Sequence, residues 1–282
     1  IFASELDADK MDYLLRDSLF AGVKYGNFDL ERILNVINLF PKGNSWHIGI
    51  DHDGVEAVEG LILARYFMFV QVYIHRTRRI YDAIMVQLVA ELLRKEYGVE
   101  RLPLDLTEFL KWDDCAILER AKYLDSPWSN MILNRRHFGC VYETELAPTK
   151  EERVLQRKVD NALKEELQNK YTPQEVIVDL FSKPAIKFLL PDEETPTINI
   201  ISKADPTRTA SFKEKAPVVA KLEEPIYAFR VYAKRNIATK VNKHIKLRRE
   251  VIWGKLTEEQ KGGFNHESEV AGGCSCEKEK TN

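Results

Sequence analysis

The sequence has little of what marks membrane, secreted and disulfide-stabilised proteins. No apolar run approaches the roughly 18 residues that a membrane-spanning helix needs, and the first residues do not form a signal peptide. Four cysteines (Cys115, Cys140, Cys274 and Cys276) are too few for a disulfide framework in a chain of 282 residues, and this favours a reducing compartment. We therefore expect a cytoplasmic protein with no membrane segment.

The chain also lacks an excess of charge of either sign. Its 42 basic and 44 acidic residues give a formal net charge of −2, so no overall charge attracts nucleic acid or an anionic membrane. With 44% hydrophobic residues, the chain is long enough to bury a sizeable core in one large domain or two smaller ones.

An initiator methionine is absent as well. Residues Ile1 to Ser4 lead directly into a strong helical pattern. We expect the chain to be a fragment, or one piece of something larger.

Helical periodicity dominates the first half of the chain. Helices are predicted from Asp7 to about Phe20, from Phe28 to Phe40 and from Val55 to about Tyr97, the last as one long helix or two joined helices. Residues Ser45 to Gly60 read as a short strand, a turn at Asp51 to Gly54 and a helix start. The pattern then continues as helix through Asp105 to Leu124 and Pro127 to Phe138.

The character changes near Leu146. A charged helix is predicted to about Lys170, followed by short β-branched segments between prolines, a clear strand from Pro225 to Arg235, and a helix from Ile237 to Trp253. The prediction is a mainly α protein: a helical body over 1–145, a small α+β lobe over 146–256, and a disordered polar tail over 257–282.

The first helix is unusually polar. In the segment LDADKMDYLLRD, helical geometry places Asp9, Tyr13 and Asp17 on one stripe, with Lys10 and Arg16 beside it. A carboxylate suits a metal ion, a lysine suits phosphate, and a tyrosine with a second acid suits a sugar. The alternative is a solvated helix face with salt bridges.

This segment, followed by GVKYGNFDLERIL, resembles the C-terminal half of the HD-domain deoxynucleoside triphosphate triphosphohydrolases, a family that includes dGTPase-like enzymes and the vertebrate enzyme with a SAM and an HD domain. The resemblance extends over most of the chain, through AVEGLILARYFMFVQVYIHRTRRIYDA, LNRRHFGCVYET and the segments INIISKADPTRTASFKEKAPVV and PIYAFRVYAKR. It implies a helical HD-domain body and hydrolysis of dNTPs to a deoxynucleoside and triphosphate.

The resemblance also implies roles for the residues of the first helix. Asp9 matches the family's last metal ligand, and Lys10 matches a residue that contacts the triphosphate. Tyr13 matches the tyrosine beneath the deoxyribose, and Asp17 matches the acid that binds the 3′-hydroxyl. The implied cofactor is a divalent metal ion (Mg, Mn, Fe, Co or Zn) whose bound water becomes a usable nucleophile near neutral pH.

The family's first histidine and its His-Asp dyad lie upstream of this segment, where the present sequence has nothing. One carboxylate does not hold a catalytic metal tightly. The catalytic histidine and dyad are therefore expected outside this chain, either in the missing N-terminal half of the same protein or in a partner chain. The active site is then composite, and we expect the chain alone to be inactive.

A literal His52-Asp53 pair, with His47 nearby, is not expected to be that dyad. The dyad belongs on a helix that faces another histidine, whereas IDHDGVE has the composition of a tight turn. It also follows the Asp9 segment, while the family order places the dyad before it.

Positive charge gathers in HRTRR, and the resemblance implies phosphate contacts from His75, Arg78 and Arg79 there. The nearest match to a family tyrosine close to the base is Tyr81, across a register that needs a small gap. The alternative is a basic solvated helix face, where such charges contribute little.

Two further arginines, Arg32 and Arg135, match positions that hold an activating nucleotide between subunits in regulated relatives. Those relatives often carry a lysine four residues after the second arginine, and here that position is Gly139. Activation by a nucleotide effector is therefore absent or differently built. Ion pairs with Asp29 or Glu143, or simple solvation, are the alternative roles.

Two functions remain in competition. The first is a metal-dependent dNTP triphosphohydrolase that forms homo-oligomers, with this chain supplying part of the site. The second is a non-catalytic regulatory or scaffold subunit that keeps the helical body, oligomerises and binds nucleotide without hydrolysing it. A third and weaker alternative is an HD phosphohydrolase for monophosphates or nucleic-acid ends.

Overall fold

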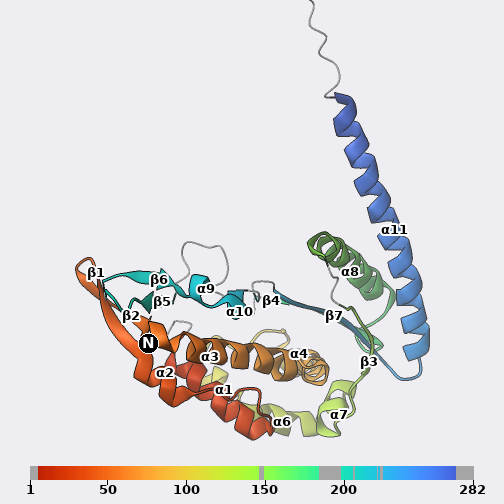
Figure 1. The fold of residues 1–282 in the computed structure, drawn as a ribbon. Coiled ribbons are helices and arrows are strands. Elements are labelled where there is room, and N and C mark those ends of the chain that lie inside the picture. Colours follow the sequence, from red (N-terminus) through yellow and green to blue (C-terminus); the bar gives the residue numbers. More distant parts are fainter. Residues whose placement is uncertain are drawn as a thin grey trace, which may run out of the picture. The chain divides into compact units, whose positions relative to one another are not determined.

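A computed structural model describes residues 6–145, 149–183, 198–205, 207–220, 222 and 225–270, the side chains of 150, 220 and 259–270 excepted. Within these residues the protein is mainly helical, with two small sheets (Figure 1). The mainly α class predicted from the sequence is confirmed to that extent.

Contacts divide the chain into two compact units, and each unit is built from two separate stretches. The first unit joins Ile1–Asp82 to Phe181–Tyr227, and the second joins Ala83–Leu180 to Ala228–Asn282. The sequence predicted three continuous segments, 1–145, 146–256 and 257–282. That division stays a prediction.

Helices of the first unit form around a buried apolar cluster. The cluster contains Met11, Leu14, Ile33, Leu61 and Met68. These residues come from three helices: α1 (Ala8–Ala21), α2 (Leu30–Val36) and α3 (Val55–Met68). Between α3 and α4 (Arg76–Tyr97) the chain makes a π-helical turn, η2 (Phe69–Tyr73). The predicted Val55–Tyr97 region is therefore two joined helices.

The sheet of the first unit has the strand order β1-β2-β5-β6. Its strands and the short helices beside it are β1 (Ile37–Lys42), β2 (Ser45–Asp51), η1 (His52–Gly54), β5 (Asn199–Ile201), β6 (Thr209–Ser211), α9 (Phe212–Lys215) and α10 (Pro217–Ala220). β1 pairs antiparallel with β2, and β2 pairs parallel with β5. The predicted strand, turn and helix start after Ser45 are confirmed.

The helix predicted from Phe28 to Phe40 is wrong beyond Val36. From Ile37 the chain extends as β1, turns at Gly43 with a φ of 61°, and pairs Ile37 with Ile50. Phe40 is buried in this arrangement. The apolar run that suggested a helix is used in a hairpin, because strand pairing satisfies its backbone and buries its side chains.

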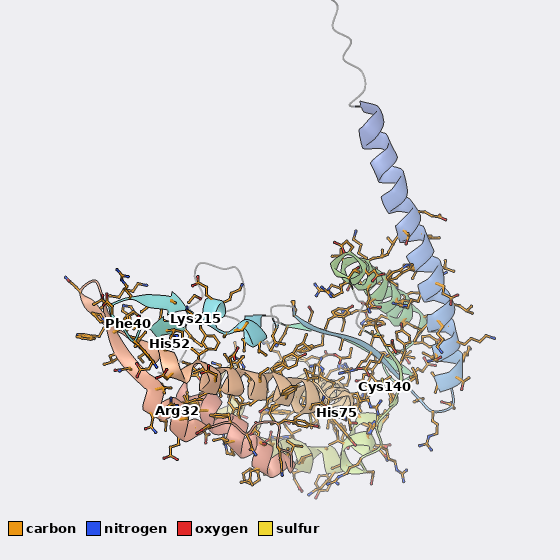
Figure 2. All side chains as sticks on the ribbon, viewed as in Figure 1. Arg32, Phe40, His52, His75, Cys140 and Lys215 are labelled. Atoms are coloured by element: carbon orange, nitrogen blue, oxygen red, sulfur yellow. The ribbon has the colours of Figure 1, made fainter. Side chains whose placement is uncertain are left out.

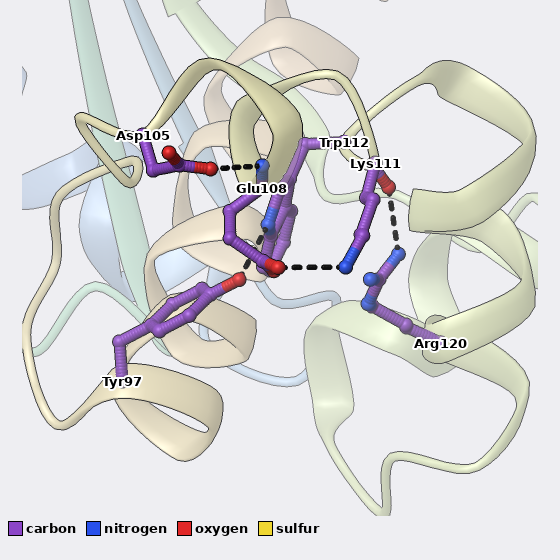
Figure 3. A network of polar contacts seen from close by, with 6 residues as sticks. All are labelled: Tyr97, Asp105, Glu108, Lys111, Trp112 and Arg120. Carbon is purple, nitrogen blue, oxygen red and sulfur yellow. Dashed lines mark hydrogen bonds and ion pairs between the residues drawn. The ribbon is translucent and has the colours of Figure 1, made fainter.

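The second unit begins along α4 and continues through α5 (Leu106–Phe109), α6 (Asp114–Lys122) and α7 (Pro127–Leu133). Polar contacts hold these pieces together (Figure 3). Trp112 Nε1 donates to Tyr97 Oη at 3.2 Å, and the Arg120 guanidinium lies 4.6 Å over the Trp112 ring and donates to the Lys111 carbonyl. The cation–π contact adds to the hydrogen bond that holds the Trp112 ring in place.

The remaining elements of the second unit include a three-stranded sheet of order β3-β7-β4 and two long helices. They are β3 (Gly139–Glu143), α8 (Lys150–Lys170), β4 (Val176–Lys183), β7 (Ile226–Ala233) and α11 (Ala238–Val270). Thr149 and Glu152 form a capping box at the start of α8, which fixes where that helix begins. The strand predicted at Pro225–Arg235 is confirmed, whereas α11 runs past the predicted end at Trp253. Residues 271–282 of the predicted tail, like most of the Pro-rich segment, lie outside the described residues.

In the described part of the chain no single helix has the length and apolar composition to cross a membrane. The bent pair His52–Tyr73 and Arg76–Tyr97 meets those limits only when both are counted together. Apolar α3 residues such as Val58 and Leu61 are buried in the first unit. Cys115 and Cys140 are free thiols, and the other two cysteines lie outside the described residues.

Candidate substrate site on the first helix

Helix α1 begins at a tight acid–base contact. Asp7 is the N-cap, as the sequence allows, and its carboxylate accepts from the Lys10 backbone N–H at 2.7 Å and from Lys10 Nζ at 2.6 Å. Asp9 lies in the same turn and is exposed. The cap satisfies an N–H that the helix cannot pair internally, and it also engages the ammonium group predicted to contact phosphate. The phosphate role of Lys10 stays a prediction.

The opposite side of α1 is fixed by packing. Met11 and Leu14 are buried in the apolar cluster, and Tyr13 lies at the edge of that cluster with Val72 and Tyr73. Gly26 approaches the helix so closely that an added Cβ would lie 2.3 Å from the Leu14 carbonyl oxygen. The polar stripe of α1 therefore belongs to a helix with a defined rotation.

Three side chains of the first unit meet on this stripe, and we call Tyr13, Asp17 and Tyr73 the Tyr–Asp cluster. Tyr73 Oη donates to Asp17 Oδ2 at 2.7 Å. The rings of Tyr13 and Tyr73 meet edge to face, with centroids 6.2 Å apart and planes at 68°. All three side chains are half-buried. The cluster offers a carboxylate and an aromatic face side by side, which suits a sugar hydroxyl and the apolar face of its ring.

Burial, and after it the hydrogen bond to Asp17, raises the pKa of the Tyr73 hydroxyl well above its ordinary value of 10.0. A phenol with a raised pKa keeps its proton at neutral pH. Tyr73 therefore acts as a fixed donor that orients Asp17, and it does not act as a base.

Tyr73 is the residue of this cluster that sequence reasoning missed, because the aromatic segment Tyr66 to Tyr73 reads as core. The residue closes the π-helical turn η2. Such turns are rare and often lie at functional sites, but single-sequence periodicity does not distinguish them from an ordinary helix. The available signal was the hydroxyl group of a tyrosine in an otherwise apolar helix, because such a hydroxyl usually has a hydrogen-bond partner when it is buried.

The basic segment after η2 is engaged within the first unit. Arg78 donates to the Tyr73 carbonyl and lies 3.5 Å from Asp82, and Arg79 lies 3.9 Å from Asp82 and 5.3 Å over the Phe181 ring. His75, labelled in Figure 2, is exposed and accepts from the Thr77 N–H at 3.3 Å.

Both arginines thus have anionic or aromatic partners already, and a phosphate would compete with Asp82 for them. Tyr81 is half-buried on α4. The phosphate roles of His75, Arg78 and Arg79, and the base role of Tyr81, stay predictions.

His52 and Asp53 lie in the short 3₁₀ turn η1 between β2 and α3, as the turn composition predicted. Their closest approach is 3.8 Å, and Asp53 forms an ion pair with Lys203 at 2.5 Å. The hydrogen bond from Lys203 is the largest of the effects that lower the pKa of Asp53. Arg32 donates to the Asp53 carbonyl at 2.9 Å, so its guanidinium links α2 to this turn.

Arg135 is exposed in the second unit and has a φ of 52°, the left-handed conformation that usually ends a helix. Gly139 begins β3, and a Cβ added there would meet no atom within 4 Å. A Cβ at this position would therefore not clash. The effector roles of Arg32 and Arg135 stay predictions.

A metal site is not complete in the part of the chain that the structure describes. No three His, Cys, Asp or Glu side chains gather there at ligand distance, and Asp9 offers a single carboxylate. A single carboxylate does not hold a catalytic divalent ion tightly. The described residues do not form a metal centre by themselves.

Comparison with known proteins covers most of the chain. Residues 28–249 match the family model described as HD associated region. A stretch of 118 residues is 38% identical to the uncharacterised protein MJ1154 of Methanocaldococcus jannaschii and covers 42% of this chain and 25% of that protein. A stretch of 131 residues is 37% identical to the uncharacterised protein YwfO of Bacillus subtilis and covers 42% of this chain and 29% of that protein. The chain thus spans under a third of the length of these relatives.

Two solved structures share the fold. A hypothetical protein from Aquifex aeolicus superposes with a TM-score of 0.64 at 26% identity, over 85% of this chain and 57% of that one. A phosphohydrolase from Bacteroides thetaiotaomicron superposes with a TM-score of 0.58 at 20% identity, over 83% of this chain and 62% of that one. In both, a large part of the other protein has no counterpart in this chain.

Proposed function

The chain belongs to the HD-associated region family, and from this premise we propose that it supplies one wall of the active site of a metal-dependent dNTP triphosphohydrolase. The reaction releases a deoxynucleoside and inorganic triphosphate. Support comes from the family, from the fold shared with a protein named a phosphohydrolase, and from the resemblance of the α1 segment to the HD triphosphohydrolases.

The observation that carries the proposal is the Tyr–Asp cluster. Asp17, held by Tyr73 at 2.7 Å, accepts the 3′-hydroxyl of the substrate. The Tyr13 ring packs beneath the sugar and leaves little room for a 2′-hydroxyl. A hydrogen bond to a charged acceptor contributes about 1.5–3 kcal/mol, enough for a clear preference between a sugar that makes it and one that does not.

The phosphates are assigned to cationic side chains of the same unit. Lys10 exchanges its contact with Asp7 for a phosphate oxygen, and His75, Arg78 and Arg79 extend the positive surface. Preformed cations at the phosphates stabilise charge that develops as triphosphate leaves. The divalent ion (Mg, Mn, Fe, Co or Zn) is held mainly by residues outside this chain, with Asp9 as the ligand that the chain contributes.

The composite site requires an HD half, either upstream in the same protein or in a partner chain. The assembled enzyme is a homo-oligomer, with Arg32 and Arg135 as the contacts for a nucleotide effector. Intact-mass measurement of the natural protein tests the premise: an upstream segment or a co-purifying HD partner supports the enzyme, and the absence of both leaves the regulatory subunit as the function.

The sugar assignment is tested by steady-state assays of triphosphate release from dGTP and GTP by the natural assembly. Asp17→Ala and Tyr73→Phe should each lower kcat/KM for dGTP, by roughly tenfold or more for the first, because an oriented acceptor is lost. Tyr66→Phe, a neighbouring tyrosine outside the cluster, is the matched control. Unchanged kcat/KM in Asp17→Ala would show that the cluster does not bind the sugar.

A further inference from the structure

The second unit contains a hollow between β3, α8 and α11 that the proposed dNTP site does not use. Two adjoining cavities of about 550 and 580 Å³ share the side chains of Tyr142, Lys246, Arg249 and Trp253. α11 packs against both α8 and β3, and the two helices are labelled in Figure 1. We call this space the α8–α11 hollow.

Helical spacing brings its cations and its indole to one face of α11. Lys246, Arg249 and Trp253 stand at i, i+3 and i+7, so their side chains lie along one stripe. The Arg249 guanidinium carbon lies 5.3 Å from the centre of the Trp253 ring. Tyr142 comes to the same space from β3, where its ring meets Phe229 edge to face. This wall thus presents two aromatic rings and two cations, with the exposed Glu250 beside them.

Arg249 also has an unused donor. Its Nε is buried and makes no hydrogen bond with any of the described residues. A buried N–H without an acceptor is unfavourable, and the planar guanidinium group binds oxyanions such as phosphate through paired N–H donors. Lys246, by contrast, is exposed where it lines the hollow, and its flexible side chain can place the ammonium group against a phosphate.

Acids also line the hollow, and Glu250 of α11, which is exposed, lines the cavity of about 550 Å³ beside Arg249. Glu145 and Glu152 line only one of the two cavities, together with Glu143. Glu143 is neutralised by Arg230 at 2.7 Å, and Glu152 is partly engaged in capping α8. Glu145 is exposed and offers carboxylate oxygens that accept from N–H groups.

We propose that the α8–α11 hollow is a binding site for a nucleoside phosphate, with the base on Tyr142 and Trp253 and the phosphates on Lys246 and Arg249. Base stacking on aromatic rings is worth about 1–3 kcal/mol per base, and Glu145 receives N–H donors of the base edge. A volume near 550 Å³ is within the range of small-ligand sites. The site shares no residue with the Tyr–Asp cluster or with Arg32 and Arg135, and it does not depend on hydrolysis.

Calorimetric titration tests it on the 282-residue chain carrying Asp17→Ala and Tyr73→Phe, so that the Tyr–Asp cluster does not contribute. GTP and ATP are the nucleotide probes, and guanosine and inorganic triphosphate are the two half-ligands. A saturable nucleotide site that binds either half-ligand at least about tenfold more weakly is expected, because stacking and phosphate contacts add.

Lys246→Gln should weaken nucleotide binding by about fivefold or more, whereas Lys243→Gln should change it by less than about twofold. Both lysines are exposed on α11 and lose the same charge, but only Lys246 lines the hollow. Trp253→Leu should weaken the binding of nucleotide but not the binding of inorganic triphosphate, because only the base stacks on the indole. Circular dichroism verifies that the variant is folded.

Three outcomes overturn the proposal: no saturable binding, equal losses in the two lysine variants, or inorganic triphosphate binding as tightly as GTP. The last identifies a simple anion site. Because no hydrolysis is measured, these results are independent of whether the dNTP hydrolase proposal stands.

Discussion

Removing one hydroxyl should loosen the Tyr–Asp cluster measurably. In Tyr73→Phe the 2.7 Å hydrogen bond to Asp17 is lost, while the edge-to-face packing on Tyr13 remains. A hydrogen bond to a charged partner is worth about 1.5–3 kcal/mol, and the half-buried position lowers this, so we expect a loss of about 1–2 kcal/mol in the free energy of unfolding. That is roughly a five- to thirtyfold change in the folding equilibrium.

The assay is urea unfolding at pH 7, with Tyr66→Phe as the control, since the Tyr66 hydroxyl makes no hydrogen bond with the described residues. A double-mutant cycle with Asp17→Asn isolates the pair, and the coupling should account for most of the loss. Equal midpoints for Tyr73→Phe and Tyr66→Phe would refute the reasoning.

The raised pKa of Tyr73 also predicts how the stability difference between wild type and Tyr73→Phe depends on pH. Because the pKa of Tyr73 is raised in the folded protein, its contribution is fully present below the unfolded value of about 10. It is lost as the pH rises from there through the folded pKa. The gap between wild type and Tyr73→Phe should therefore be constant from neutral pH to about pH 9 and narrow in more alkaline solution.

Three further predictions concern the frame of the first unit. Gly26→Ala should lower stability by about 1–3 kcal/mol because its Cβ would lie 2.3 Å from the Leu14 carbonyl oxygen; an unchanged melting temperature contradicts this. Gly60→Ala, with no atom within 4 Å of the new Cβ, should raise stability by about 0.5–1 kcal/mol, and a loss would mean that α3 is packed more tightly there. Lys203→Met should return the lowered pKa of Asp53 toward its ordinary value of 3.8, as followed by carboxyl NMR. The ion pair stabilises the fold above about pH 4 and is lost as the pH falls through the lowered pKa, so an unmoved Asp53 titration would show that the pair does not form.

Local signals in the sequence carried part of the fold. The helix start at Asp7 and the turn around His52 were predicted, because each depends on residues within a few positions. The helix predicted to Phe40 failed because the alternative, pairing with β2 and β5, involves residues as distant as Ile200. Short apolar runs do not reveal such partners.

The candidate site also contains residues that the sequence predicts and one residue that it does not. Asp9, Tyr13 and Asp17 share a stripe that helical spacing alone predicts. Tyr73 lies 56 residues after Asp17 in the sequence and reaches it through the π-helical turn η2. The periodicity of the sequence does not predict such a turn. The α8–α11 hollow was equally hidden, because Tyr142 and Trp253 meet only through the packing of α11 on β3.

The most direct test of the composite active site is triphosphate release from dNTPs by the natural assembly carrying Asp9→Ala, compared with Asp12→Ala. Both are exposed acids of α1, and Asp12 pairs only with Arg16 among the contacts described, at 2.9 Å. Loss of a metal ligand should lower kcat/KM by at least about 100-fold, with reduced metal content, while Asp12→Ala stays near wild type. Full triphosphate release by Asp9→Ala would contradict the account.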